Sequence, residues 1–168
     1  MIRAAWRRWA LAVLVLALAL AGCSRDTAVT AVTVSAGPVS VALPVSASCA
    51  APSGATELTC RGDENDAGAP HLALAPGTPL AISVPSDVGD TPWVIVFSYR
   101  DAQGRQQQGD RTPVFPAKQR YSYDLKPPKG AQLTRLEVQS LIAAPTRDGG
   151  VEFPAVRTWV LVIDPATG

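Results

Sequence analysis

Four side chains near the middle of the chain could do chemistry together, because one is an imidazole and three are carboxylates. His71 is the only histidine, and Asp63, Glu64 and Asp66 lie shortly before it. A histidine beside a carboxylate is a common general base in hydrolases. One hypothesis is therefore a hydrolase of the cell envelope with a site near His71. A hydrogen-bonded strand histidine in front of a solvated acidic loop is the simpler interpretation.

This segment does not fit the known catalytic and metal-binding patterns. The chain has no Gly-x-Ser-x-Gly, Ser-x-x-Lys or His-Glu-x-x-His motif and no glycine-rich phosphate loop. An EF-hand loop starting at Asp63 would place Ala67 and Leu74 where oxygen ligands are required. We therefore expect a protein that is not an enzyme, with no catalytic residue, no metal and no cofactor.

One of the three cysteines, Cys23, ends an apolar run that follows a short cationic N-terminus. Arg3, Arg7 and Arg8 lie within the first nine residues, and no charged residue occurs from Ala10 to Gly22. The run is too short for a permanent membrane helix, which needs about 20 apolar residues. A cationic start followed by a short apolar run is typical of a secretory signal peptide.

The end of this run, Leu20-Ala21-Gly22-Cys23, closely resembles the lipobox of bacterial lipoproteins. The resemblance implies that residues 1–22 are removed and that the Cys23 thiol is alkylated with diacylglycerol. Several acyl chains hold a protein firmly, because each buried methylene contributes about 0.8 kcal/mol. We expect an extracytoplasmic protein, lipid-anchored to the cell membrane, in which residues 23–28 form the lipidated N-terminus and a short tether.

Cys49 and Cys60 remain as an even pair once Cys23 is assigned to lipid. Disulfides persist in extracytoplasmic compartments, so we predict a bond between them. Pro52, Ser53 and Gly54 favour a turn in the loop that the bond would close. In the chain-entropy model such a bond contributes on the order of 3 kcal/mol. A metal site is the weaker alternative, because a metal usually needs three or four ligands.

The mature chain has the size of one domain and almost no net charge. Removal of the signal leaves 146 residues, with 12 Lys and Arg against 14 Asp and Glu, a formal charge of −2. Nothing in this balance favours binding to nucleic acid. The expected partners are the membrane, through the lipid on Cys23, and an envelope protein or small ligand that the sequence does not identify.

Apolar residues alternate with polar ones along several short stretches, as in strands with one buried face. In the stretch 92–99, Trp93, Ile95, Phe97 and Tyr99 share one face, while Val94 and Val96 make the other face apolar, which predicts a central strand. The mature chain has no three-turn stretch with helical spacing, and 15 prolines disfavour helices. These patterns predict an all-β, antiparallel immunoglobulin-like β-sandwich as a single domain over residues 29–168.

Three further stretches carry a resemblance to a known family. "PWVIVFSYRDAQG", "TPVFPAKQRYSYDL" and "TWVLVI", together with the lipobox and the early cysteine pair, are similar to a family of small actinobacterial lipoproteins with a domain of unknown function. The resemblance implies a location in the cell envelope. It assigns no activity and no binding residues.

The hypothesis that these observations favour is a membrane-anchored cell-envelope lipoprotein that acts as a binding or accessory module. The envelope hydrolase near His71 is one alternative. A structural or adhesive surface protein is another, because Arg61-Gly62-Asp63 spells a tripeptide that some extracellular proteins use to engage integrins.

Overall fold

The fold was analysed in a computed structural model, which describes residues 31–51, 57–62, 66–146 and 148–166. Two sheets pack face to face around one hydrophobic core cluster. The smaller sheet has four strands, all antiparallel to their neighbours. Its strands, in spatial order, are β2 (Val39–Leu43), β1 (Val32–Ala36), β6 (Leu80–Ser83) and β9 (Ser122–Leu125).

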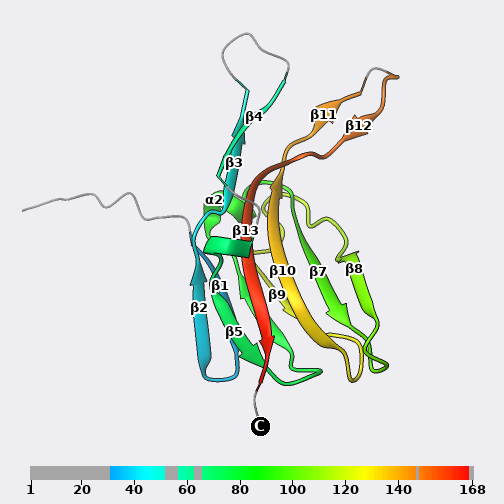
Figure 1. The fold of residues 1–168 in the computed structure, drawn as a ribbon. Helices are drawn as coiled ribbons and strands as arrows, with labels where there is room; N and C mark the ends of the chain where they lie inside the picture. The colour runs from blue at the N-terminus through cyan, green and yellow to red at the C-terminus, as the bar shows by residue number, and fades with distance from the viewer. Residues whose placement is uncertain (1–30, 52–56, 63–65, 147, 167–168) are drawn as a thin grey trace, which may run out of the picture.

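The larger sheet is built around the two longest strands, which pair with each other along most of their length (Figure 1). Its spatial order is β4 (Thr59–Gly62), β3 (Ala47–Ala50), β13 (Ala155–Pro165), β10 (Gln132–Leu141), β7 (Trp93–Arg100) and β8 (Gln106–Arg111). A seventh strand, β5 (His71–Leu74), pairs only with β13. Among the described residues, the elements outside the two sheets are η1 (Asp66–Gly68), α2 (Ser86–Gly89) and the small hairpin of β11 (Ala144–Pro145) and β12 (Val151–Glu152).

The core confirms the predicted central strand. Trp93, Ile95 and Phe97 of β7 are buried in the core, and β7 lies between β10 and β8. Val94 on the opposite face is also buried, as its apolar neighbourhood in the sequence indicated. Trp93 and Trp159 are both fully buried, so the only two tryptophans of the described residues pack inside the sandwich. The all-β prediction is therefore confirmed, with α2 and η1 as short connecting turns.

One strand pair departs from the antiparallel expectation. β5 runs parallel to the last residues of β13, with His71 opposite Val162 and Leu74 opposite Pro165. The other end of the same β13 edge pairs antiparallel with β3, at Arg157 and Thr158. Parallel neighbours need a long connection, and residues 75–154 separate β5 from β13. One edge of β13 is thus shared by two strands that run in opposite directions.

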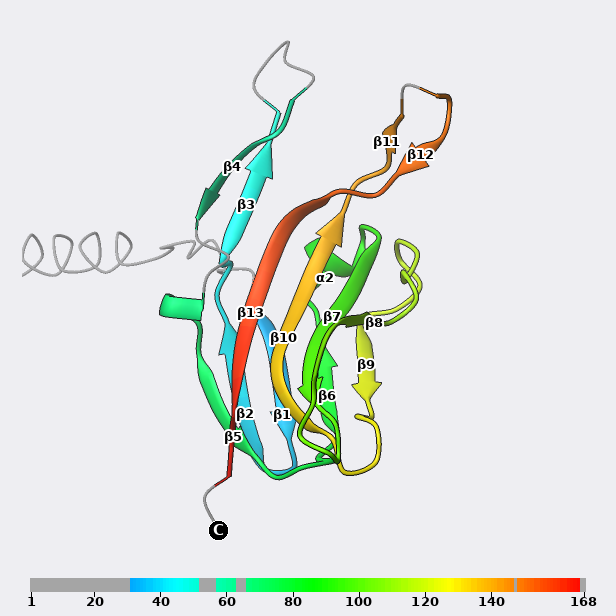
Figure 2. The same cartoon turned by 45° about the vertical axis from the view of Figure 1, so that its right-hand side comes forward.

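Two hairpins extend beyond the sandwich from the same end (Figures 1 and 2). One is the β3–β4 arm, made of these two strands. The other is the β11–β12 arm, residues 142–154, which continues from the paired residues Leu141 and Ala155 at the end of β10 and the start of β13. Within the described residues, no helix is both long and apolar enough to cross a membrane.

Candidate functional site

The β3–β4 arm is a two-stranded ribbon with different chemistry on its two faces. Cys49 lies opposite Cys60 in the antiparallel register, and the predicted disulfide joins them with an S–S distance of 2.06 Å. Ser48 pairs with Arg61 in the same register. Because successive side chains of a strand point to opposite faces, the disulfide lies on one face and the Ser48 and Arg61 side chains lie on the other.

A hollow of about 480 Å³ lies on the face of the arm opposite the disulfide. The described residues that line it are Ser48, Ala50, Ala51, Thr59 and Arg61. The small residues leave the space, the two hydroxyl groups supply hydrogen-bond donors and acceptors, and the guanidinium supplies a positive charge. The hollow is therefore suited to a small polar group or to a chain segment with an acidic or carbonyl oxygen.

Backbone contacts attach the base of the arm to the sandwich. Ser46 donates its N–H to the carbonyl oxygen of Thr158 at 2.8 Å, and the N–H of Val160 donates to the Ser46 hydroxyl at 3.1 Å. Gly62, the last residue of β4, has a positive φ of 101°, and a Cβ there would overlap the backbone oxygen of Ser46. A glycine is needed at this position for both reasons. Gly62 thus has a structural role in the arm and Arg61 lines its hollow, while Asp63 lies outside the described residues.

His71 is paired with a carboxylate that the sequence analysis did not propose. Its Nδ1 atom lies 2.9 Å from Oδ2 of Asp164, and both side chains are at least half exposed. The residues directly across the strands from this pair are Val162 and Ala73, which carry no nucleophile. Asp63, Glu64 and the side chain of Asp66 lie outside the described residues. The geometry therefore supplies an oriented imidazole on the surface of β5 and β13, with no adjacent hydroxyl or thiol across the strands.

A second hollow, of about 350 Å³, lies on the smaller sheet. The residues lining it are Ser35, Gly37, Pro79, Leu80, Ala81, Asp124 and Lys126. Ala81 pairs with Ser35 on one side and with Asp124 on the other, so three adjacent strands form its floor. This hollow lies over a regular part of the sheet, and Asp124 and Lys126 place one charge of each sign at it.

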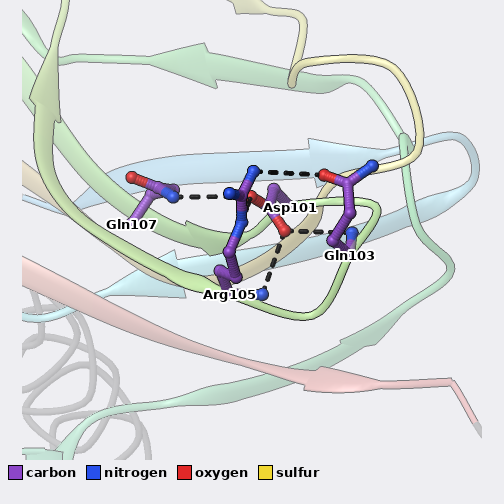
Figure 3. A network of polar contacts seen from close by, with 4 residues as sticks. All are labelled: Asp101, Gln103, Arg105 and Gln107. Atoms are coloured by element: carbon purple, nitrogen blue, oxygen red, sulfur yellow. Dashed lines mark hydrogen bonds and ion pairs between the residues drawn. The ribbon is translucent and has the colours of Figure 1, made fainter.

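The turn between β7 and β8 contains a polar network that stabilises the hairpin (Figure 3). Asp101 accepts hydrogen bonds from the backbone N–H groups of Gln103 and Arg105, at 3.0 and 2.9 Å, and from Nε of Arg105 at 2.8 Å. Desolvation raises the pKa of the Asp101 carboxyl, but these hydrogen bonds and the Arg105 charge outweigh it and lower the pKa overall. The network explains the turn and leaves its carboxylate fully occupied.

No metal centre is found in the part of the chain that the structure describes. There, no group of three or more His, Cys, Asp or Glu side chains is placed to hold an ion. The β3–β4 arm and its hollow are the candidate site, because the hollow brings Arg61 and two hydroxyl groups together on a disulfide-linked ribbon. The sequence located the disulfide of this site, but the residues that share its face became visible only once the register of β3 and β4 was known.

Comparisons with known proteins identify the family. A family model described as "Protein of unknown function (DUF2771)" matches residues 24–164, which include both sheets and both arms. No curated protein and no solved structure matches the chain. The matched segment begins directly after Cys23 and ends within β13. The chain therefore belongs to the DUF2771 family.

Proposed function

We propose that this protein is a cell-envelope lipoprotein, anchored to the membrane through lipid on Cys23, whose sandwich acts as a binding or accessory module. The binding surface is the hollow of the β3–β4 arm, with Arg61, Ser48 and Thr59 as its polar groups. We also propose that the chain is one of the small actinobacterial lipoproteins that its lipobox and early cysteine pair resemble.

The observation that carries this proposal is that the Cys49–Cys60 disulfide lies outside the hydrophobic core cluster. Among the described residues, none from β3 or β4 belongs to the hydrophobic core cluster, and the strand pairing of this arm with the rest of the sheet is limited to Arg157–Ser48 and Thr158–Ala47. A covalent link in such a ribbon reduces its conformational freedom. A stiff arm with a polar hollow presents a preorganised surface, which reduces the entropic cost of binding.

The Cys49–Cys60 disulfide also supports a location outside the cytoplasm. Disulfides of this kind persist outside the cytoplasm. The lipobox-like Leu20-Ala21-Gly22-Cys23 lies directly before the segment that the family model matches. Removal of residues 1–22 would leave a lipidated cysteine directly followed by the segment that the family model matches.

We further propose that the sandwich is of immunoglobulin-like type. β10 lies between β7 and β13, as the F strand lies between C and G, and β8 extends that sheet beyond β7 as a C′ strand does. In the other sheet β6 lies beside β9, as B lies beside E. The β1–β2 hairpin then takes the outer position next to β6, and the β3–β4 arm is an addition to the basic sandwich.

The test is the native mass of the protein extracted from its membranes in mild detergent. We expect the mass of residues 23–168 plus acyl chains, less the two hydrogens lost in the disulfide, together with a stoichiometric bound component. The Cys23→Ser variant should leave the membrane fraction unlipidated. The Arg61→Ala variant should keep the lipid and the disulfide and lose the bound component.

The matched control is Arg105→Ala, which removes another exposed arginine, in the turn between β7 and β8 at the end of the sandwich opposite the arm (Figure 1). This variant should retain the bound component. An unprocessed or unlipidated wild-type mass would overturn the anchor, and a component that survives Arg61→Ala would overturn the proposed binding surface.

A further inference from the structure

Large apolar side chains that remain exposed are concentrated at the end of the sandwich from which the two arms extend. The exposed large hydrophobic residues among those described are Val39, Val114, Tyr121, Ile142, Val151 and Phe153. Three of them, Ile142, Val151 and Phe153, belong to the β11–β12 arm. Only Val39, next to the β1–β2 turn, lies at the opposite end (Figure 1).

Val114 and Tyr121 lie at the arm end of the sandwich, although they come from another loop. Val114 precedes Phe115, which pairs with Trp93 at the start of β7, and Trp93 lies opposite Ser140 near the end of β10. The carbonyl oxygen of Tyr121 accepts a hydrogen bond from the N–H of Val84, just after β6. The apolar residues therefore mark one end of the molecule, with the β11–β12 arm as its most exposed part.

The N-terminal side of the described chain enters at this same end. Val32 at the start of β1 lies opposite Leu43 at the end of β2, and the chain from Leu43 leads over three residues into β3. The last residues of β13 lie at the opposite end (Figures 1 and 2). An anchor at Cys23 would therefore bring the arm end, rather than the C-terminal end, toward the membrane.

The length of the connection permits the arm to reach the bilayer. Seven residues lie between Cys23 and Ala31, the first described residue, so the two are eight residue steps apart and at most about 29 Å from each other when the chain is extended. The five residues from Ile142 to Thr146, which include β11, reach roughly 17 Å at about 3.3 Å per residue when extended. The tip of the arm can therefore contact lipid while the acyl chains on Cys23 are inserted.

We propose that the β11–β12 arm is a lipid-contacting element, with Phe153 and Val151 as the side chains that enter the interface of the bilayer. This inference rests on the proposed lipidation of Cys23. Two or three apolar side chains bind a bilayer only weakly by themselves, so the arm orients a domain that the lipid already anchors. The charged residues in the arm sequence are Arg147, Asp148 and Glu152, a net charge of −1, so the contact is apolar and does not rest on a cationic cluster that would need anionic lipid.

The test uses the full lipidated protein in phosphatidylcholine vesicles with brominated acyl chains, which quench tryptophan fluorescence on contact. Phe153→Trp is compared with Val39→Trp, because the two positions are 48% and 49% exposed and lie at opposite ends of the sandwich. Trp93 and Trp159 are fully buried and give the same background in both variants. We expect a loss of emission and a blue shift for Phe153→Trp only.

The outcomes separate this inference from the proposed function. Equal emission from the two variants, in a protein whose mass shows the lipid on Cys23, overturns the arm contact and leaves the anchor in place. A blue shift without quenching means that protein, such as a second copy of the chain, covers the arm, and it also overturns the inference. A chain that carries no lipid overturns both proposals.

Discussion

Arg157 on β13 holds Asp87 in α2, although the two residues are 70 positions apart. Its Nη1 donates to Oδ2 of Asp87 at 2.8 Å, and its Nη2 donates to the backbone oxygen of the same residue at 2.8 Å. The guanidinium also lies 5.4 Å from the centre of the Trp159 ring. These contacts tie the connection between β6 and β7, one strand from each sheet, to the longest strand of the larger sheet.

We expect Arg157→Ala to lower the free energy of unfolding by roughly 1–2 kcal/mol, because it removes hydrogen bonds to a carboxylate and a cation–π contact. The side chain of Arg157 is only 25% exposed, so solvent screens the pair incompletely. Urea denaturation measures the loss. Arg157→Lys should recover part of it, since an ammonium group keeps the charge but not the forked geometry. Equal stability of the alanine variant and the wild type would contradict the prediction.

The double variant Cys49→Ser/Cys60→Ser tests how independent the β3–β4 arm is. The chain-entropy model assigns such a bond about 3 kcal/mol when the ordering of its loop is coupled to global folding. Because no described arm residue joins the core cluster, we expect a smaller loss of global stability. Hydrogen exchange should show faster exchange of the amides of β3 and β4 and unchanged protection of β7 and β10. A loss of protection across the whole sandwich would show that the arm is required for the core.

Tyr121 should titrate at higher pH than an ordinary tyrosine. Its hydroxyl donates to Oδ1 of Asp90 at 2.5 Å, and this hydrogen bond, with desolvation and the carboxylate charge, raises the pKa of Tyr121 above the usual 10.0. A group whose pKa is raised in the folded state stabilises the fold below its unfolded pKa and loses that contribution as the pH rises through the folded pKa. The stability from this pair is therefore present at neutral pH and is lost only in alkaline solution.

An absorbance titration of tyrosinate formation checks this. Asp90→Asn should shift one tyrosine to lower pH, because it removes the carboxylate, while Tyr121→Phe should remove that titration altogether. An unchanged titration curve in Asp90→Asn would show that the hydrogen bond is not maintained in solution.

His71 supplies the test of the hydrolase alternative. We expect the lipidated protein to hydrolyse neither cell-wall nor lipid ester substrates, and His71→Ala to alter stability by no more than about 0.5 kcal/mol, because its pair with Asp164 is exposed. A hydrolysis assay with purified protein measures the first expectation, and urea denaturation measures the second. An activity that is lost in both His71→Ala and Asp164→Asn would overturn the non-enzymatic proposal.

The sequence by itself determined that residues 93–99 form a central strand. Trp93, Ile95 and Phe97 share one face and lie in the core, and Val94 on the other, equally apolar face is also buried. It also predicted the disulfide, since the assignment of Cys23 to lipid leaves Cys49 and Cys60 as an even pair, and the structure joins the two.

Only the tertiary structure decided what is close in space but distant in the chain. Asp164 follows His71 by 93 residues and reaches it because β5 runs parallel to the end of β13. The gathering of both arms, the apolar residues and the N-terminal side at one end follows from strand order and direction. Local alternation shows that a segment is a strand, but the choice of its neighbour depends on the packing of the whole sandwich.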